Sequence, residues 1–396
     1  MLPLLLAASH ARSGLGGPVV FCTHPKALAP TASDAPVSEY LTPMILPLRR
    51  RLPALALLGL LAGAARPVAA QIGGQQAFSF LNLPGSAKLA GLGGVNVSSR
   101  DADGTMLFGN PALLNADMDG RLALGYVDYL ADIKQSTADY VFNTAHAGRF
   151  GVGLSYLNYG RFEQVDAAGN SLGEFSVNEY ALSVSDSYTS GSFTVGGTLK
   201  LAVSGISGNH SVATLADVGG LFKHPEQDFT VGLVVRNAGY QLKTYDGAGH
   251  EPMPLDVQLG TSFKPEHLPF RFSFTAHHLQ KLDIVYLDPS QRGQLDASGN
   301  EVEPKKTLGD KIARHFVVGG ELLLSKNLNL RVGYNHLQRR ELRLDNTSGG
   351  AGFSFGAMLR ISEFQLDYTH AGYHASGSAN YFTVSRNLSS LFKKSE

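Results

Sequence analysis

The chain has 396 residues, of which 33 are basic and 33 acidic, so its formal net charge is zero. This balance argues against a nucleic-acid partner bound by bulk charge. The only cysteine is Cys22, and no apolar run long enough for a membrane-spanning helix follows Ala70, so we expect neither a disulfide framework nor a transmembrane helix.

The first part of the chain is interpreted as a secretory signal. Residues 44–70 contain three consecutive arginines, then a short apolar stretch, then small residues that end at Ala70. This order is typical of a Sec-type signal peptide, and we expect cleavage near Ala70. Residues 1–43 are then an over-extended start, with a genuine N-terminal extension as the alternative.

Residues 71–120 do not alternate and are rich in glycine. The stretch 86–94 is made of small residues and tolerates a helix. Large apolar side chains lie at several positions between Phe78 and Leu114, and they would be exposed if the segment were a loose arm. We therefore expect a plug or hatch folded into the lumen of a barrel, with a periplasmic arm as the alternative.

This segment also carries a candidate hatch motif. Asn110 begins a tight turn, and Pro111 takes the first position of one helical turn. The aspartates of the Asp-Ala-Asp-Gly stretch match the start of a calcium loop, but the acid expected at its twelfth position is missing, so we interpret them as turn and cap residues. The residues with an expected structural or gating role are Gly93, Gly94, Asp101, Asp103, Asn110, Pro111 and Ala112.

From residue 121 to residue 388 the chain repeats segments of about ten alternating apolar and polar residues. In one of them Phe270, Phe272 and Phe274 share one face of the strand. The pattern predicts fourteen strands, at 121–130, 137–149, 151–159, 174–188, 191–203, 208–222, 228–240, 253–263, 269–280, 315–325, 327–335, 351–361, 363–371 and 379–388. Residues 389–396 form a tail.

The predicted connections alternate between short turns and longer loops, and both ends lie on the side of the short turns. This arrangement is typical of an outer-membrane barrel whose short turns face the periplasm. The fold class is therefore all-β, a transmembrane outer-membrane β-barrel of about 14 antiparallel strands with an N-terminal plug. A soluble β-sandwich or propeller is the alternative, but the fixed-period repeat of a propeller is missing.

The sequence holds no phosphate loop, dinucleotide fingerprint, nucleophile elbow or zinc-protease motif. We expect no catalytic residues, no metal and no cofactor, so the protein is not expected to be an enzyme. His277 and His278 are adjacent in a predicted strand and should point to opposite faces, which makes a metal site there unexpected.

Two loop regions are candidates for contacts with a partner. The longest connection, 281–314, is the first candidate for a docking surface, because loops of this length are usually functional or disordered. Its candidate docking residues are Asp288, Arg292, Lys305 and Lys306. Three arginines at the start of a later loop are candidates for contacts with anionic lipopolysaccharide, although a solvated loop edge explains them as well. They are Arg339, Arg340 and Arg343.

Several stretches, in one order along the chain, resemble a known family. The stretch from Ser86 to Gly94, followed by an acidic pair and then by Asn110-Pro111-Ala112, resembles the hatch of the FadL family of fatty-acid transporters, whose members are fourteen-stranded barrels. Stretches spread over residues 72–388 resemble the PorQ family within that superfamily. They include IGGQQAFSFLNLPGSAKLAGLGG, NPALL, YLNYGRFEQVDAAGNSLGEFSVNEYAL, GLVVRNAGYQLKTY, GYNHLQRREL and FQLDYTHAGYHASGSANYFTVSRNL.

The resemblance implies an outer-membrane component of the type IX secretion machinery of Bacteroidetes. Its implied partners are the attachment-complex proteins PorZ, PorU and PorV, in an outer membrane that contains lipopolysaccharide. A non-enzymatic barrel that holds a PorZ-like protein at the cell surface is the first functional hypothesis. The alternative is a FadL-like channel for long-chain fatty acids or other hydrophobic small molecules, and it predicts an apolar pocket between plug and wall and a lateral opening in one strand.

Overall fold

The computed structural model describes residues 76–144, 148–166, 168–285, 307–342, 349–374 and 377–389. The expected extension 1–43, the signal 44–70 and nearly all of the tail lie outside the described residues. No helix in the described part is long and apolar enough to cross a membrane.

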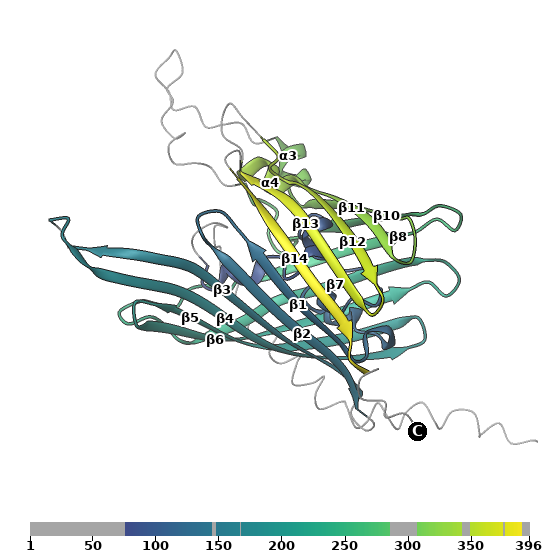
Figure 1. Ribbon diagram of the computed structural model, residues 1–396, viewed down its shortest axis with the longest axis horizontal. Helices are drawn as coiled ribbons and strands as arrows, with labels where there is room; N and C mark the ends of the chain where they lie inside the picture. Colours follow the sequence, from purple (N-terminus) through teal and green to yellow (C-terminus); the bar gives the residue numbers. More distant parts are fainter. Residues whose placement is uncertain are drawn as a thin grey trace, which may run out of the picture. The chain divides into compact units, whose positions relative to one another are not determined.

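In this part of the chain fourteen antiparallel strands form a closed barrel, in which every strand pairs with its neighbours in sequence and β1 pairs with β14 (Figure 1). Eight residue pairs join β1 to β14, from Arg121 opposite Asn387 to Asp128 opposite Asn380. The predicted closed barrel of fourteen antiparallel strands is therefore confirmed. The strands are β1 (Arg121–Asp128), β2 (Lys134–Thr144), β3 (Gly148–Val165), β4 (Ser171–Ser190), β5 (Phe193–Ile206), β6 (Asn209–Lys223), β7 (Phe229–Lys243), β8 (Asp256–Phe263), β9 (Phe270–Ala276), β10 (Phe316–Leu323), β11 (Leu328–Asn335), β12 (Phe353–Ile361), β13 (Phe364–His374) and β14 (Gly377–Asn387).

The alternation in the sequence separates two faces of the wall. In β5, Thr198, Lys200 and Ala202 are buried, whereas Leu199 between them is 69% exposed. The same pattern in the other strands covers the outside of the barrel with leucine, valine, phenylalanine and tyrosine side chains. A closed barrel with an apolar outer face and a polar inner face is stable in a lipid bilayer and unstable in water, so this fold is that of an outer-membrane barrel.

The predicted alternation of short and long connections is wrong at two hairpins, where the strands are longer than expected. Only residues 375–376 separate β13 from β14, where a longer loop was expected. The connection between β5 and β6 is only Ser207-Gly208, and both residues have positive φ, 50° and 82°. Two such residues are typical of a tight hairpin turn that follows the twist of its strands. Between β3 and β4 the predicted loop 160–173 shrinks to five residues, because the two strands pair as far as Val165 and Ser171.

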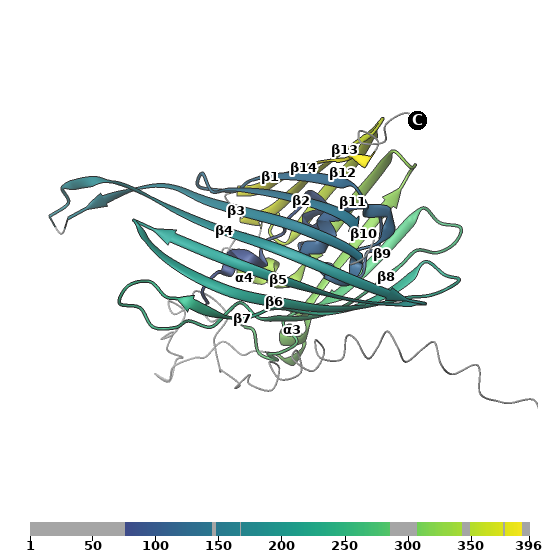
Figure 2. The ribbon, with the colours of Figure 1, turned by 90° about the horizontal axis from the view of Figure 1, so that it is seen from below.

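Residues 76–120, named here the inner segment, lie inside the barrel (Figure 2). The segment contains η1 (Ser79–Asn82), α2 (Ala87–Gly91), η2 (Gly104–Phe108), η3 (Pro111–Leu113) and η4 (Ala116–Met118). It contacts strands around the whole circumference, including β2, β5, β6, β11 and β14. Only a segment within the lumen can reach all of these strands at once.

Glycines on the inner wall make room for the inner segment. A Cβ atom added to Gly219 of β6 would lie 1.9 Å from Oδ1 of Asn110, and one added to Gly232 of β7 would lie 2.1 Å from the carbonyl oxygen of Val97. The neighbouring Gly220 has open space around the same position. The wall is therefore shaped to fit this segment.

We expect Gly219→Ala to weaken the packing of the inner segment against the wall, because the new methyl group overlaps the buried amide of Asn110. Overpacking of this kind costs about 1–3 kcal/mol. The purified variant should lose that much unfolding free energy, and protease should cleave its inner segment faster. Gly220→Ala is the matched control and should behave as the parent protein. Equal unfolding free energies and equal cleavage rates in the two variants would contradict this close packing of the inner segment against β6.

Candidate functional site

The candidate functional site is the contact between the inner segment and the inner wall. At this contact, backbone carbonyl groups of the segment accept hydrogen bonds from threonine side chains of the wall. Oγ1 of Thr369 donates to the carbonyl oxygen of Ala87 at 2.7 Å, and Oγ1 of Thr230 donates to that of Ser98 at 2.7 Å. Because the segment has little regular structure, these donors satisfy carbonyls that would otherwise be buried without a partner.

The expected hatch residues lie within the inner segment. The predicted helical turn is present as η3, in which Asn110 caps the turn by accepting from the backbone N–H of Ala112 at 2.9 Å, and Pro111 begins it. Nδ2 of Asn110 donates to the carbonyl oxygen of Val97 at 2.9 Å. Gly93 follows α2 and approaches Val317 of the wall so closely that a Cβ atom would overlap its side chain. These residues hold the segment together, and a gating role for them stays a prediction.

The two aspartates of the motif have different partners. Asp103 caps η2 by accepting from the backbone N–H of Thr105 at 3.1 Å, as the cap interpretation expects. Asp101 forms ion pairs with Lys88 of the segment and with Arg271 of β9, at 3.4 Å to the arginine. This second role, which joins the segment to the wall, was not predicted from the sequence.

A network of buried charges continues from Asp101 along the wall. Nη1 of Arg271 lies 3.1 Å from Oε2 of Glu321, and Nε of Arg331 lies 3.0 Å from Oε1 of the same glutamate. Arg331 also pairs with Asp367. Lys88 is 1% exposed. Basic and acidic side chains alternate through this network. The three basic ones, Lys88 included, balance the three acidic ones, so the charges compensate each other inside the lumen.

A separate apolar patch lies between the segment and the wall. Phe78, Phe80 and Leu81 of the inner segment pack against inward-facing side chains at the loop-side ends of β3 to β6. The wall residues of this patch are Leu157, Ala181, Ala202, Ala213 and Leu215. Most other inward-facing positions on these strands carry serine, threonine, glycine or charged side chains. Two further apolar clusters between the segment and the wall include Val141 and Leu221, and Val127 and Tyr381.

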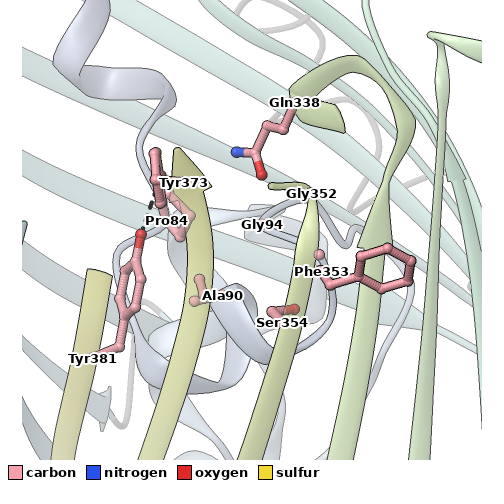
Figure 3. Close-up of a pocket in the computed structure, with 11 residues that line it drawn as sticks. Pro84, Ala90, Gly94, Gln338, Gly352, Phe353, Ser354, Tyr373 and Tyr381 are labelled. Atoms are coloured by element: carbon pink, nitrogen blue, oxygen red, sulfur yellow. Dashed lines mark hydrogen bonds between the residues drawn. The ribbon is translucent and has the colours of Figure 1, made fainter. Parts of the chain in front are cut away.

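A cavity of about 10 Å³ lies between Pro84, Ala90 and Gly94 of the segment and β12 to β14, with Gln338 of α4 (His336–Glu341) at its edge (Figure 3). This volume holds about one water molecule. The cavity is therefore too small to be the expected continuous apolar pocket. A groove of about 280 Å³ between β12, β13 and β14 lies on the outer, lipid-facing wall.

The predicted surface residues fall into two groups. Asp288, Arg292, Lys305, Lys306 and Arg343 lie outside the described residues. Arg339 and Arg340 are described, but they lie in α4 and not in a loop. Arg339 donates to the carbonyl oxygen of Gly349 at 2.9 Å, so it serves the local fold. A contact of either arginine with lipopolysaccharide stays a prediction.

Arg340 joins α4 to α3 (Leu308–Ala313), a helix within the connection that was expected to be a loop (Figure 1). Its Nε lies 2.9 Å from Oδ1 of Asp310. Burial raises the pKa of Asp310, but the hydrogen bond and charge of Arg314, with the charges of Arg340 and His336, outweigh burial, so the pKa lies below its ordinary value of 3.8. The carboxylate therefore stays ionised and holds the two helices together at neutral pH.

We expect Arg331→Met to destabilise the protein by about 3–5 kcal/mol, because Glu321 and Asp367 would each lose a buried partner. The unfolding free energy of the purified protein measures this loss. Arg386→Met is the control, since the side chains of its pair with Glu363 are 29% and 46% exposed and the loss of this surface pair should cost less than about 1 kcal/mol. Equal losses in both variants would show that the buried network contributes nothing beyond a surface pair.

Among known proteins, the chain shows similarity to solved barrel structures, and only in the fold of the barrel. No family model matches the chain, and no curated protein matches it. Among solved structures, a TodX monoaromatic hydrocarbon channel mutant is 14% identical, with 77% of this chain and 97% of that chain covered and a TM-score of 0.43. A Pseudomonas aeruginosa FadL homologue is 11% identical, with 76% and 98% covered and a TM-score of 0.42. The KdgM porin is 7% identical, with 67% and 98% covered and a TM-score of 0.30. With values this low, function has to be inferred from the chain's own side chains.

Proposed function

We propose that the protein is a channel of the outer membrane for apolar small molecules, such as long-chain fatty acids, and that its inner segment closes it in this conformation. The observation that carries the proposal is the apolar patch on the inner wall, which Phe78, Phe80 and Leu81 cover. A lumen that conducts only water and ions has no need for such a patch, since polar side chains line aqueous barrels.

The position of the patch supports entry from outside. Ala202 and Ala213 pair near the β5–β6 hairpin, at the same end of the barrel as the long connection between β7 and β8. The end with the long connections faces outward in bacterial barrels. A ligand that arrives from the cell surface would therefore meet the patch before it meets the buried charges.

The start of the inner segment is suited to make way for a ligand. Phe78 has a positive φ of 56°, which is costly for a bulky residue. The backbone of this part has few direct bonds to the barrel, among them the amide of Ala77 to the carbonyl oxygen of Pro252 at 3.2 Å and Arg236 to the carbonyl oxygen of Leu81 at 3.1 Å. An acyl chain that buries the same wall surface can replace the contacts of one phenylalanine, which are worth about 1.5–3 kcal/mol.

We expect saturable binding of a fluorescent long-chain fatty acid to the protein in lipid nanodiscs, measured against empty nanodiscs. Phe80→Ala should raise the affinity roughly tenfold, because the covering ring is removed, and Leu157→Gln should lower it by a similar factor. Leu154→Gln is the matched control on β3, since Leu154 faces outward. Absence of saturable binding, or equal effects of both leucine variants, would contradict the proposal.

A second function is supported by a different observation, the α3 helix on the loop side. Leu308 and Ile312 of this helix are 73% and 51% exposed, while Asp310 between them fixes the helix to α4. A fixed helix with exposed apolar side chains fits a protein-docking surface. With the resemblance to the PorQ family, this favours a barrel that anchors a PorZ-like protein of the type IX attachment complex.

We expect Leu308→Glu combined with Ile312→Glu to release a PorZ-like protein from the cell surface into the medium, because charged side chains would replace apolar contacts. Quantitative immunoblots of cells and medium measure the release. Leu268→Glu, at an exposed leucine in the short turn after β8, is the control and should retain the partner. Retention in both variants, with the barrel inserted normally, would rule out α3 as the docking surface.

A further inference from the structure

Three side chains at the loop-side rim of the barrel form a cluster of metal-binding type. Asp256 begins β8, and His277 and His278 follow the last residue of β9, the neighbouring strand. One ligand atom from each of the three lies within 4.8 Å of the other two. The expectation that the two histidines point to opposite faces is wrong.

The backbone at His278 explains why both imidazoles lie on one side. Its φ is 55°, in the left-handed region, so the alternation of a strand ends there. The ring centroids of the two histidines are 4.6 Å apart. A left-handed conformation is unfavourable for a non-glycine residue, and such strain is concentrated at functional sites.

The cluster offers nitrogen atoms that have no other use. Nε2 of His277, a residue 3% exposed, has no hydrogen-bond partner among the described residues, and Nδ1 of His278 also lacks one. Nδ1 of His278 lies 3.3 Å from Oδ1 of Asp256. A neutral imidazole offers the lone pair of one ring nitrogen to a metal ion.

The carboxylate of the cluster is oriented by its neighbours. Oδ1 of Asp256 accepts from the backbone N–H of His278 at 2.6 Å, and Oδ2 accepts from Nε2 of Gln258 at 2.6 Å. Outer contacts of this kind fix metal ligands in position. Arg236 lies opposite Asp256 in the β7–β8 register, and its Nη2 donates to the carbonyl oxygen of Leu81.

We propose that Asp256, His277 and His278 bind one divalent transition-metal ion of the Zn²⁺ class at the rim of the barrel. Two imidazoles and one carboxylate form a ligand set that zinc accepts, with a fourth position open to water or an external ligand. Bonds of about 2.0–2.2 Å place tetrahedral ligand atoms about 3.4 Å apart. From separations of up to 4.8 Å, the ligand atoms need to approach one another by up to about 1.4 Å, which rotation about the side-chain χ angles provides. The bound ion would join the start of β8 to the segment after β9, at the base of the longest connection.

The experiment uses the full chain, purified in detergent without a histidine tag and treated with a chelator that is then removed. Equilibrium dialysis against ZnCl₂ should give one high-affinity Zn²⁺ per chain, and Co²⁺ should give the visible absorption of a tetrahedral site. His277→Gln and His278→Gln should each lower the affinity at least tenfold. His267→Gln, an exposed histidine in the turn between β8 and β9, is the matched control and should keep the full affinity.

The ion-binding proposal stands apart from the channel proposal, because its three ligands are not among the residues that form the apolar patch. Circular dichroism and gel mobility of the unheated protein establish that each variant is folded. Should His277→Gln fail to fold, His278→Gln and the Co²⁺ absorption of the parent protein still decide the question. Binding no tighter in the parent than in His278→Gln, or no tetrahedral Co²⁺ absorption in the parent, would overturn the proposal.

Discussion

The structure depends on one constraint, that a backbone in lipid has no water with which its polar groups can form hydrogen bonds. Every N–H and C=O group at membrane depth must find a partner within the protein, and a sheet achieves this only when it closes on itself. The pairing of β1 with β14 provides that closure. Because each strand is bonded on both edges, the side chains alone decide which face meets the lipid, and the alternation along each strand follows from this requirement.

Closure also creates an interior that has to be filled. The inner segment fills it with irregular chain, and this choice has a cost, since irregular backbone leaves carbonyl groups without partners. Threonines of the wall supply donors, as Thr369 does for Ala87, and glycines such as Gly219 remove the side chains that would obstruct close approach. The wall and the segment are thus complementary in both hydrogen bonding and shape.

The inner segment is held by ion pairs on one side of the interior and by apolar contacts on the other. Toward β9, β11 and β13 the segment is held by compensated charges around Arg331, which are strong when complete and costly when broken. Toward β3 to β6 it is held by apolar contacts around Phe80, which another apolar molecule can replace. One part of the segment is therefore held firmly by charges, and the contacts of the other part can be replaced by an apolar ligand. The proposed channel depends on this difference.

Much of the fold could be predicted from the chain alone. Alternation of apolar and polar residues determines strands, because burial of one face requires a period of two, and fourteen such segments were visible in the sequence. Proline after Asn110 likewise marked a helical turn, since its fixed φ suits the first position of a helix. Strand ends were less predictable, because β3 and β4 continue to pair beyond their clearly alternating parts.

The candidate site was decided by the tertiary structure. Lys88, Arg271, Glu321 and Arg331 are far apart in the sequence, and only the register of neighbouring strands and the path of the inner segment bring their charges together. Lone charges within alternating strands, such as Arg331 between Leu330 and Val332, were the available signal. The pattern of the chain determined that the protein is a barrel with an apolar outside, because that property is local and periodic. Which inward side chains meet, and that His277 and His278 share one side, depended on contacts and on a single backbone angle that no periodic pattern encodes.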